Sequence, residues 1–84
     1  MNEYSLVQAI FDQMSSIVAS RHATSVRRVR VRIGHNAGVD PDLFRTAYDM
    51  FRVKTFCDEA PLEIDEDASD ALMLEQIEME VGGV

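Results

Sequence analysis

Residues 26–33 constrain the fold of this chain more than any other stretch. Three β-branched residues alternate there with three arginines: Val29, Val31 and Ile33 with Arg28, Arg30 and Arg32. A period of two is typical of a strand with one buried and one exposed face. The segment therefore predicts a sheet whose apolar face is covered by another layer of structure.

The arginine face has two interpretations. A row of arginines could bind nucleic acid or a phosphorylated ligand, or it could pair with carboxylates on neighbouring strands. Residues 55–84 carry ten acidic residues and no basic one, and the net charge of the chain is −7. This balance argues against nucleic acid as a partner, because phosphate contacts need a basic surface. We therefore predict that the arginines face four carboxylates on other strands: Glu63, Asp65, Glu78 and Glu80.

Residues 5–20 show the spacing of an amphipathic helix. The apolar stripe consists of Leu6, Ile10, Met14 and Ile17, widened by Val7, Phe11 and Val18. Ser5 and Gln8 fit a capping box, which predicts that residues 1–4 precede the helix. His22 then falls at the end of this helix, where a positive charge complements the helix dipole.

A second helix is predicted to start after Asp40, a good N-cap residue, with Pro41 at its first position. Its expected apolar stripe is Leu43, Ala47, Met50 and Phe51, flanked by Phe44 and Tyr48. We expect this helix to end near residue 53 or 54.

The remaining sequence predicts two more strands. Alternation returns in residues 61–65 and near the end of residues 72–81, although Leu, Met, Glu and Gln also allow a helix in residues 71–80. The acidic residues 66–71 are predicted to form a hairpin-length link. The order helix, strand, helix, strand, strand predicts an α/β fold: a two-layer sandwich with two helices packed on one face of a small three-stranded mixed sheet.

Length and composition limit the classes of function. With 84 residues we expect a single domain, and the one cysteine, Cys57, excludes both an intrachain disulfide and a zinc site built from cysteines. One thiol and no visible export signal favour the cytoplasm, and no apolar run is long enough for a membrane span. No nucleophile–base pair or phosphate-binding loop is recognisable, so we do not expect an enzyme.

Four segments together resemble the HypA/HybF family of hydrogenase nickel-incorporation proteins. The start, Met1-Asn2-Glu3-Tyr4-Ser5-Leu6, is similar to the Met-His-Glu-x-Ser-Leu opening of that family. Residues 26–34 resemble its first strand, residues 38–41 the loop before its second helix, and residues 74–80 its last strand. The order and spacing of these segments carry the resemblance, which identifies residues 1–84 with the nickel-binding-type domain of the family.

The resemblance implies a nickel metallochaperone, an accessory factor in the maturation of nickel–iron hydrogenase that acts by docking and metal delivery. The implied partners are a hydrogenase-type large subunit and a maturation GTPase. The alternative is a metal-free protein-interaction adaptor that keeps the same scaffold. Pairing of two copies into a homodimer through an exposed sheet edge is also compatible with the sequence.

The resemblance also implies a metal site formed by Met1, Asn2, Glu3 and Asp40. The nickel site of the family uses the N-terminal amine, the next backbone nitrogens and the imidazole of a histidine, a planar nitrogen set that suits Ni(II). In this chain Asn2 replaces that histidine. A neutral amide is a poor substitute for imidazole, so we expect nickel binding to be weak or absent.

Other interpretations of these residues remain open. His35, in the loop before Asp40, or His22 could supply an imidazole instead. Asp40 is equally explained as an N-cap, and Glu3 as a favourable charge at the positive end of the first helix. The family also carries a zinc domain, built from two Cys-x-x-Cys pairs, between its last two strands. Only residues 66–71 occupy that place here, so zinc is not expected.

Overall fold

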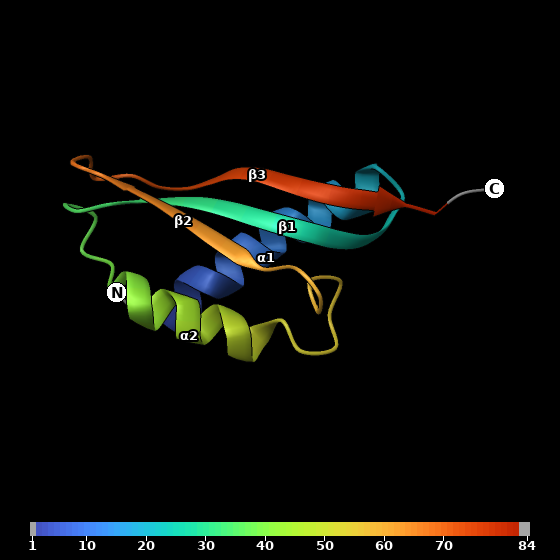
Figure 1. The fold of residues 1–84 in the computed structure, drawn as a ribbon, viewed down its shortest axis with the longest axis horizontal. Helices are drawn as coiled ribbons and strands as arrows, with labels where there is room; N and C mark the ends of the chain where they lie inside the picture. Colours follow the sequence, from blue (N-terminus) through green and yellow to red (C-terminus); the bar gives the residue numbers. More distant parts are fainter. Residues whose placement is uncertain (1, 83–84) are drawn as a thin grey trace.

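The computed structural model describes residues 2–82 and contains two helices and three strands among them (Figure 1). In chain order they are α1 (Glu3–Ser20), β1 (Ala23–Gly34), α2 (Pro41–Phe51), β2 (Leu62–Asp67) and β3 (Leu72–Val81). The sheet has the order β2-β1-β3, with β1 parallel to β2 and antiparallel to β3. Both helices lie on one side of this mixed sheet, which confirms the predicted fold class and the strand at the end of the chain.

The apolar face of β1 forms the centre of the core. Val26, Val29 and Val31 are 0% exposed and Ile33 is 1% exposed. The register shifts between Val26 and Arg28, so two arginines in succession face solvent while the valines on either side face the helices. A bulge of this kind adds one residue to a strand and restores the alternation beyond it.

Helix α2 buries a different stripe from the predicted one. Phe44, Ala47 and Tyr48 are buried, whereas Leu43 is 55% exposed and Met50 is 63% exposed. Two contacts of this helix with the residues before and within β2 set its rotation: the hydroxyl of Tyr48 donates to the carbonyl of Ala60 over 2.7 Å, and Arg45 Nη1 donates to the carbonyl of Leu62 over 2.8 Å. The helix also ends at Phe51, two or three residues earlier than predicted.

Strands β2 and β3 are not neighbours in the sheet, because β1 lies between them. Residues 68–71 cross the end of β1 and are held there by hydrogen bonds. The N–H of Gly34 donates to the carbonyl of Ala71 over 2.7 Å, and the N–H of Asn36 donates to the carbonyl of Ser69 over 3.0 Å. A link of hairpin length is therefore confirmed, but it joins two strands that are not neighbours.

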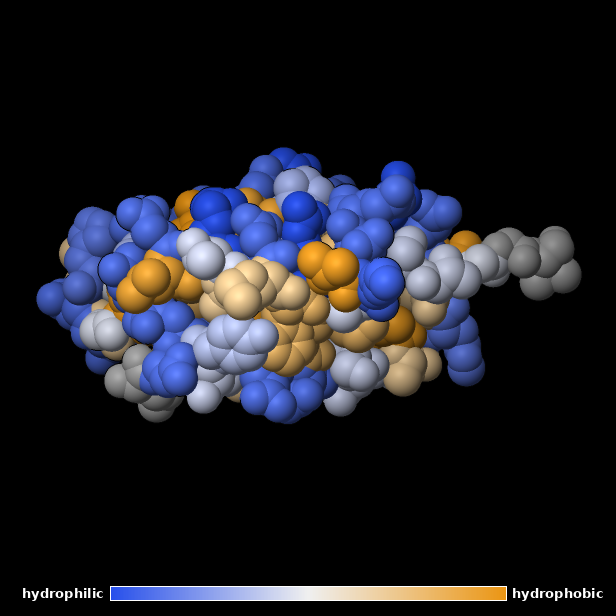
Figure 2. Space-filling view, turned by 90° about the horizontal axis from the view of Figure 1, so that it is seen from below, coloured by the Kyte–Doolittle hydropathy of each residue, from blue (hydrophilic) through white to orange (hydrophobic). Residues whose placement is uncertain are grey.

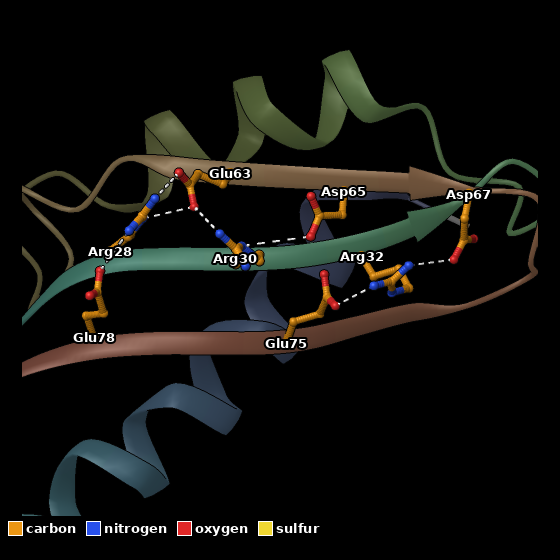
Figure 3. Close-up of polar contacts among 8 residues, drawn as sticks. All are labelled: Arg28, Arg30, Arg32, Glu63, Asp65, Asp67, Glu75 and Glu78. Carbon is orange, nitrogen blue, oxygen red and sulfur yellow. Dashed lines mark hydrogen bonds and ion pairs between the residues drawn. The ribbon is translucent and has the colours of Figure 1, made fainter.

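The exposed face of the sheet carries the predicted ion pairs (Figure 3). Arg28 contacts Glu63 at 2.6 Å and Glu78 at 3.4 Å, and Arg30 contacts Glu63 at 3.4 Å and Asp65 at 3.8 Å. Each of these side chains is at least one-third exposed, so each pair contributes little on its own.

Two carboxylates outside the predicted set also pair with an arginine on this face, and Glu80 pairs with a different arginine from those predicted. Arg32 lies between Asp67 at 2.7 Å and Glu75 at 2.6 Å, neither of which was predicted. Glu80 pairs with Arg27 at 3.6 Å and not with the three alternating arginines. Because each of those three arginines contacts two carboxylates, this face is unsuited to binding phosphates.

Substitution of Gly34 by alanine should destabilise the protein. A Cβ at this position would overlap the carbonyl oxygen of Ser69, so the crossing link would have to move. We expect a loss of about 1 to 3 kcal/mol in the free energy of unfolding, measured by urea denaturation. Gly38→Asn is the matched control, because nothing lies within 4 Å of a Cβ there and asparagine tolerates its positive φ of 72°. Equal stability of Gly34→Ala and the unmodified protein would contradict the contact.

Protonation of Asp67 in acid should lower the free energy of unfolding. The N–H and hydroxyl of Ser69 donate to its carboxylate, and Arg32 adds a charge, so the pKa of Asp67 is lowered from 3.8 to about 2. A carboxyl group with a lower pKa in the folded state stabilises that state above its unfolded pKa, and this contribution is lost as pH falls toward 2. Urea denaturation of Asp67→Asn should therefore give lower stability at pH 6 and a weaker acid dependence. Asp65→Asn is the control, and an unchanged acid dependence in Asp67→Asn would refute the assignment.

Candidate functional site

The beginnings of the two helices meet at one end of the molecule. The carboxylate of Glu3, in the first turn of α1, accepts a hydrogen bond from the backbone N–H of Asp40 over 3.1 Å. Asp40 is the N-cap of α2. This contact joins residues 37 positions apart in the sequence, and it brings together two of the residues that the resemblance implied for a metal site.

Asn2 caps α1, which corrects the predicted start of that helix. Its side-chain Oδ1 accepts a hydrogen bond from the N–H of Tyr4 over 2.8 Å, and its carbonyl accepts from the N–H of Leu6. Ser5 is therefore inside the helix, and the predicted capping box with Gln8 is wrong. Asparagine is as good an N-cap as serine, and starting at Asn2 also brings the negative charge of Glu3 to the positive end of the helix dipole.

Asp40 has the N-cap role that the sequence predicts. Its Oδ1 accepts from the N–H of Asp42 over 2.9 Å and from the N–H of Leu43 over 3.3 Å, and Pro41 occupies the first helical position. The carboxylates of Glu3 and Asp40 thus gather at the N-terminus of α2, where backbone N–H groups and the helix dipole favour negative charge.

Neither histidine contacts Asn2, Glu3 or Asp40 in the interactions found among the described residues. His35 is exposed, and its Nε2 lies 3.7 Å from Glu66. His22 is exposed with a φ of 52°, just beyond the C-terminal end of α1. Because Asn2 precedes the other end of this 18-residue helix, His22 lies roughly 27 Å away along its axis.

Cys57 lies in the core. It is 0% exposed, and its Sγ is 4.0 Å from Met14 Sδ. Burial raises the pKa of the Cys57 thiol to about 11, and burial also raises the pKa of the Tyr48 hydroxyl. A thiol held in its neutral form is a poor metal ligand.

The described side chains do not form a metal-binding cluster on their own. Within residues 2–82 no three side chains of His, Cys, Asp or Glu are gathered closely enough to hold a metal ion. Asn2 uses its amide oxygen for the helix cap, and Met1 lies outside the described residues. A nickel site at this end therefore needs donors from the N-terminal amine and the backbone.

An open groove lies beside the N-terminus of α1. Its volume is about 210 Å³, and it is lined by Asn2, Glu3, Tyr4, Leu43, Thr46, Ala47 and Met50. Figure 2 shows apolar residues gathered across this face of the molecule, with hydrophilic residues around them. The sequence contained a signal for this groove, because Leu43, Ala47 and Met50 follow helical spacing, but their stripe was assigned to the core.

No helix in the described part of the chain, residues 2–82, is long and apolar enough to cross a bilayer.

Replacement of Asn2 by alanine should destabilise α1. Loss of an N-cap side chain leaves a helix N–H without its partner, so we expect the free energy of unfolding to fall by about 0.5 to 2 kcal/mol. Ser5→Ala is the matched control and should change stability by less than about 0.5 kcal/mol, since Ser5 does not cap the helix. Urea denaturation of both variants measures this difference, and a larger loss in Ser5→Ala would reinstate the capping box.

Comparison with known proteins adds to this geometry. A family model described as hydrogenase/urease nickel incorporation, metallochaperone, hypA matches residues 1–81. The hydrogenase maturation factor HypA of Shewanella baltica (strain OS185) is 38% identical over 64 residues, which are 76% of this chain and 55% of that protein. The HypA of Wolinella succinogenes is 34% identical over 65 residues, which are 77% of this chain and 55% of that protein. The chain spans about half the length of these curated relatives.

Two solved structures share the fold. The solution structure of the Ni metallochaperone HypA from Helicobacter pylori has a TM-score of 0.84 and 21% identity, and the match covers 98% of this chain and 100% of that one. A second solution structure of a HypA protein has a TM-score of 0.77 and 20% identity, and covers 98% of each chain. The match of the family model over residues 1–81, together with relatives more than 30% identical, shows that the chain belongs to the HypA family.

Proposed function

We propose that this chain is an accessory factor in the maturation of a nickel–iron hydrogenase, acting by docking and nickel delivery without catalysis. The family description and the names of the relatives support this function. The observation that carries it is the hydrogen bond from the N–H of Asp40 to the carboxylate of Glu3. It fixes the start of α1 against the start of α2, so that the carboxylates of Glu3 and Asp40 lie at the same end of the molecule.

In this function nickel is cargo, and the chain must both hold and release it. The N-terminal amine and the nearby backbone nitrogens would supply the donors, and the carboxylates of Glu3 and Asp40 would favour a cation beside them. The amide of Asn2 supplies no imidazole nitrogen, and its oxygen already accepts the N–H of Tyr4. We therefore propose a weak site, from which nickel is readily transferred.

Calorimetric titration of the untagged chain with Ni(II) tests this proposal. We expect binding of one equivalent, and loss of that binding when the N-terminus is extended by a few residues, because the amine is then removed from the site. Asn2→His should bind nickel at least about tenfold more tightly, since it adds an imidazole donor.

Asp40→Asn and Asp65→Asn are compared in the same titration. The first should weaken nickel binding and the second should not, because Asp65 lies on the opposite side of the sheet from the helices and pairs with Arg30. Absence of binding in the unmodified chain, or binding unchanged by N-terminal extension and by Asp40→Asn, would overturn a nickel site at this N-terminus.

A second function is favoured by the use of Asn2 as a helix cap. The amide oxygen of Asn2 already caps α1, and Asn2 lines an open apolar groove. Both features suit an adaptor that keeps the scaffold and binds other proteins without metal. Pull-down from the native cell distinguishes this function. Recovery of maturation factors or hydrogenase-type subunits by a chain that binds no nickel would support the adaptor, and their absence would count against it.

The remaining assignments are proposals of the same kind. The partners would be a hydrogenase-type large subunit and a maturation GTPase, and two copies could pair through the exposed edge of β3. We also propose that residues 1–84 act as one nickel-binding-type domain, since α1, β1, α2 and β2 supply buried core residues and apolar residues of β3 pack against them. The absence of zinc and a cytoplasmic location stay predictions that rest on the single cysteine.

A further inference from the structure

Three of the six exposed large apolar side chains of the described residues line one groove. Tyr4 is 43% exposed, Leu43 55% and Met50 63%. Leu43 and Met50 are seven residues apart on α2 and lie on the same side of that helix, with Tyr4 opposite them on α1. A contiguous apolar patch of this kind, rimmed by polar residues, is typical of a protein interaction site (Figure 2).

The groove is anchored to the rigid core. The ring of Tyr4 packs against Phe51 with centroids 5.5 Å apart, and Phe51 packs against the buried Phe11 at 5.0 Å. The volume of about 210 Å³ is below the roughly 300 to 1,000 Å³ that is typical of small-molecule pockets. An open apolar hollow of this size fits side chains projecting from a partner helix better than it fits a whole cofactor.

The charges beside the groove define the partner further. Glu3 lines the α1 side, while Asp42 and Asp49 directly precede the apolar Leu43 and Met50 on the α2 side. The carboxylate of Glu3 accepts the N–H of Asp40, and that of Asp49 is paired with Arg52. The charged residue that lines the groove is therefore acidic, and Asp42 in the first turn of α2 adds a second carboxylate next to Leu43.

Neither basic residue of α2 and its C-cap lines the groove, and Arg52 pairs with Asp49 at 3.2 Å. Arg45 donates to the carbonyl of Leu62 over 2.8 Å, and Arg52 donates to the carbonyls of Asp58 and Ala60 over 3.2 Å. A second copy of the chain seated in the same groove would bring like charges together, and an anionic membrane would meet the same repulsion. Both occupants are therefore disfavoured by charge.

We propose that this groove is a docking site for an amphipathic helix of a partner protein, with a stripe of large apolar residues flanked by Lys or Arg. The apolar side chains would contact Leu43 and Met50, and the basic residues would face Glu3 and Asp42. The inference deepens the proposed function and rests on it in one respect, since a delivery factor must dock on its target. It does not depend on nickel.

Titration of the isotope-labelled full chain with defined peptides, followed by NMR, tests this site. The probe is a synthetic amphipathic helix of about 16 residues with one leucine stripe flanked by lysines, and its matched control has glutamates in place of the lysines. We expect amide shifts at residues 2–4 and 42–50 with the lysine peptide, and at least about tenfold weaker binding of the glutamate peptide.

Variants separate this groove from other surfaces. Leu43→Glu and Met50→Glu should each weaken binding of the lysine peptide by about tenfold or more, because each removes an apolar contact. Met73→Glu is the matched control, as Met73 is 49% exposed on β3, away from the groove, and it should bind unchanged. Thermal unfolding verifies that all three variants remain folded.

The opposite results would overturn the proposal. They are absence of peptide binding, equal binding of both peptides, equal losses in Met73→Glu and Met50→Glu, or shifts confined to the sheet. Self-association or binding to anionic vesicles that Met50→Glu abolishes would assign the groove to those occupants instead. Because the peptide titration contains no nickel, its failure leaves the nickel titration intact, and failure of nickel binding leaves the peptide result intact.

Discussion

Burial of one face of β1 is the interaction on which the rest of the structure depends. Val26, Val29, Val31 and Ile33 are almost fully removed from water, and each contributes about 1.5 to 3 kcal/mol of apolar burial. Two helices cover this face, and their packing against each other brings their N-termini together. The other face of β1 carries the arginines, so the strands on both sides supply carboxylates. The position of the candidate site thus follows from how a single strand is covered.

Local signals in the sequence predicted what local physics determines. The alternation in residues 26–33 identified the strand and its two faces, and Asp40-Pro41 identified the start of α2. The strand order could not be read in this way. Alternation states which side chains are buried, but a parallel and an antiparallel neighbour require the same alternation. Placing β1 between β2 and β3 is a non-local outcome, and the length of the link between the last two strands does not state which strands are neighbours.

The errors at the candidate site have a common cause, which is competition between two adequate local patterns. Asn2 and Ser5 are both good N-caps, and the earlier start is favoured by the contact of Glu3 with Asp40 and by the place of Glu3 in the first turn of α1. On α2 the apolar residues span about 160°, nearly half of the helix circumference, so the sequence left open which of them face the core. Tertiary contacts at Tyr48 decided the rotation and left Leu43 at the surface.

The crossing link at residues 68–71 has a consequence for how such a domain can be extended. Because β1 separates β2 from β3, the end of β2 and the start of β3 lie two strand spacings apart, about 10 Å. Neither end of this gap carries a residue of the buried core. This end of the sheet can therefore accept an inserted domain in place of the link. A domain whose own termini lie about that far apart could replace residues 68–71 without altering the register of β1.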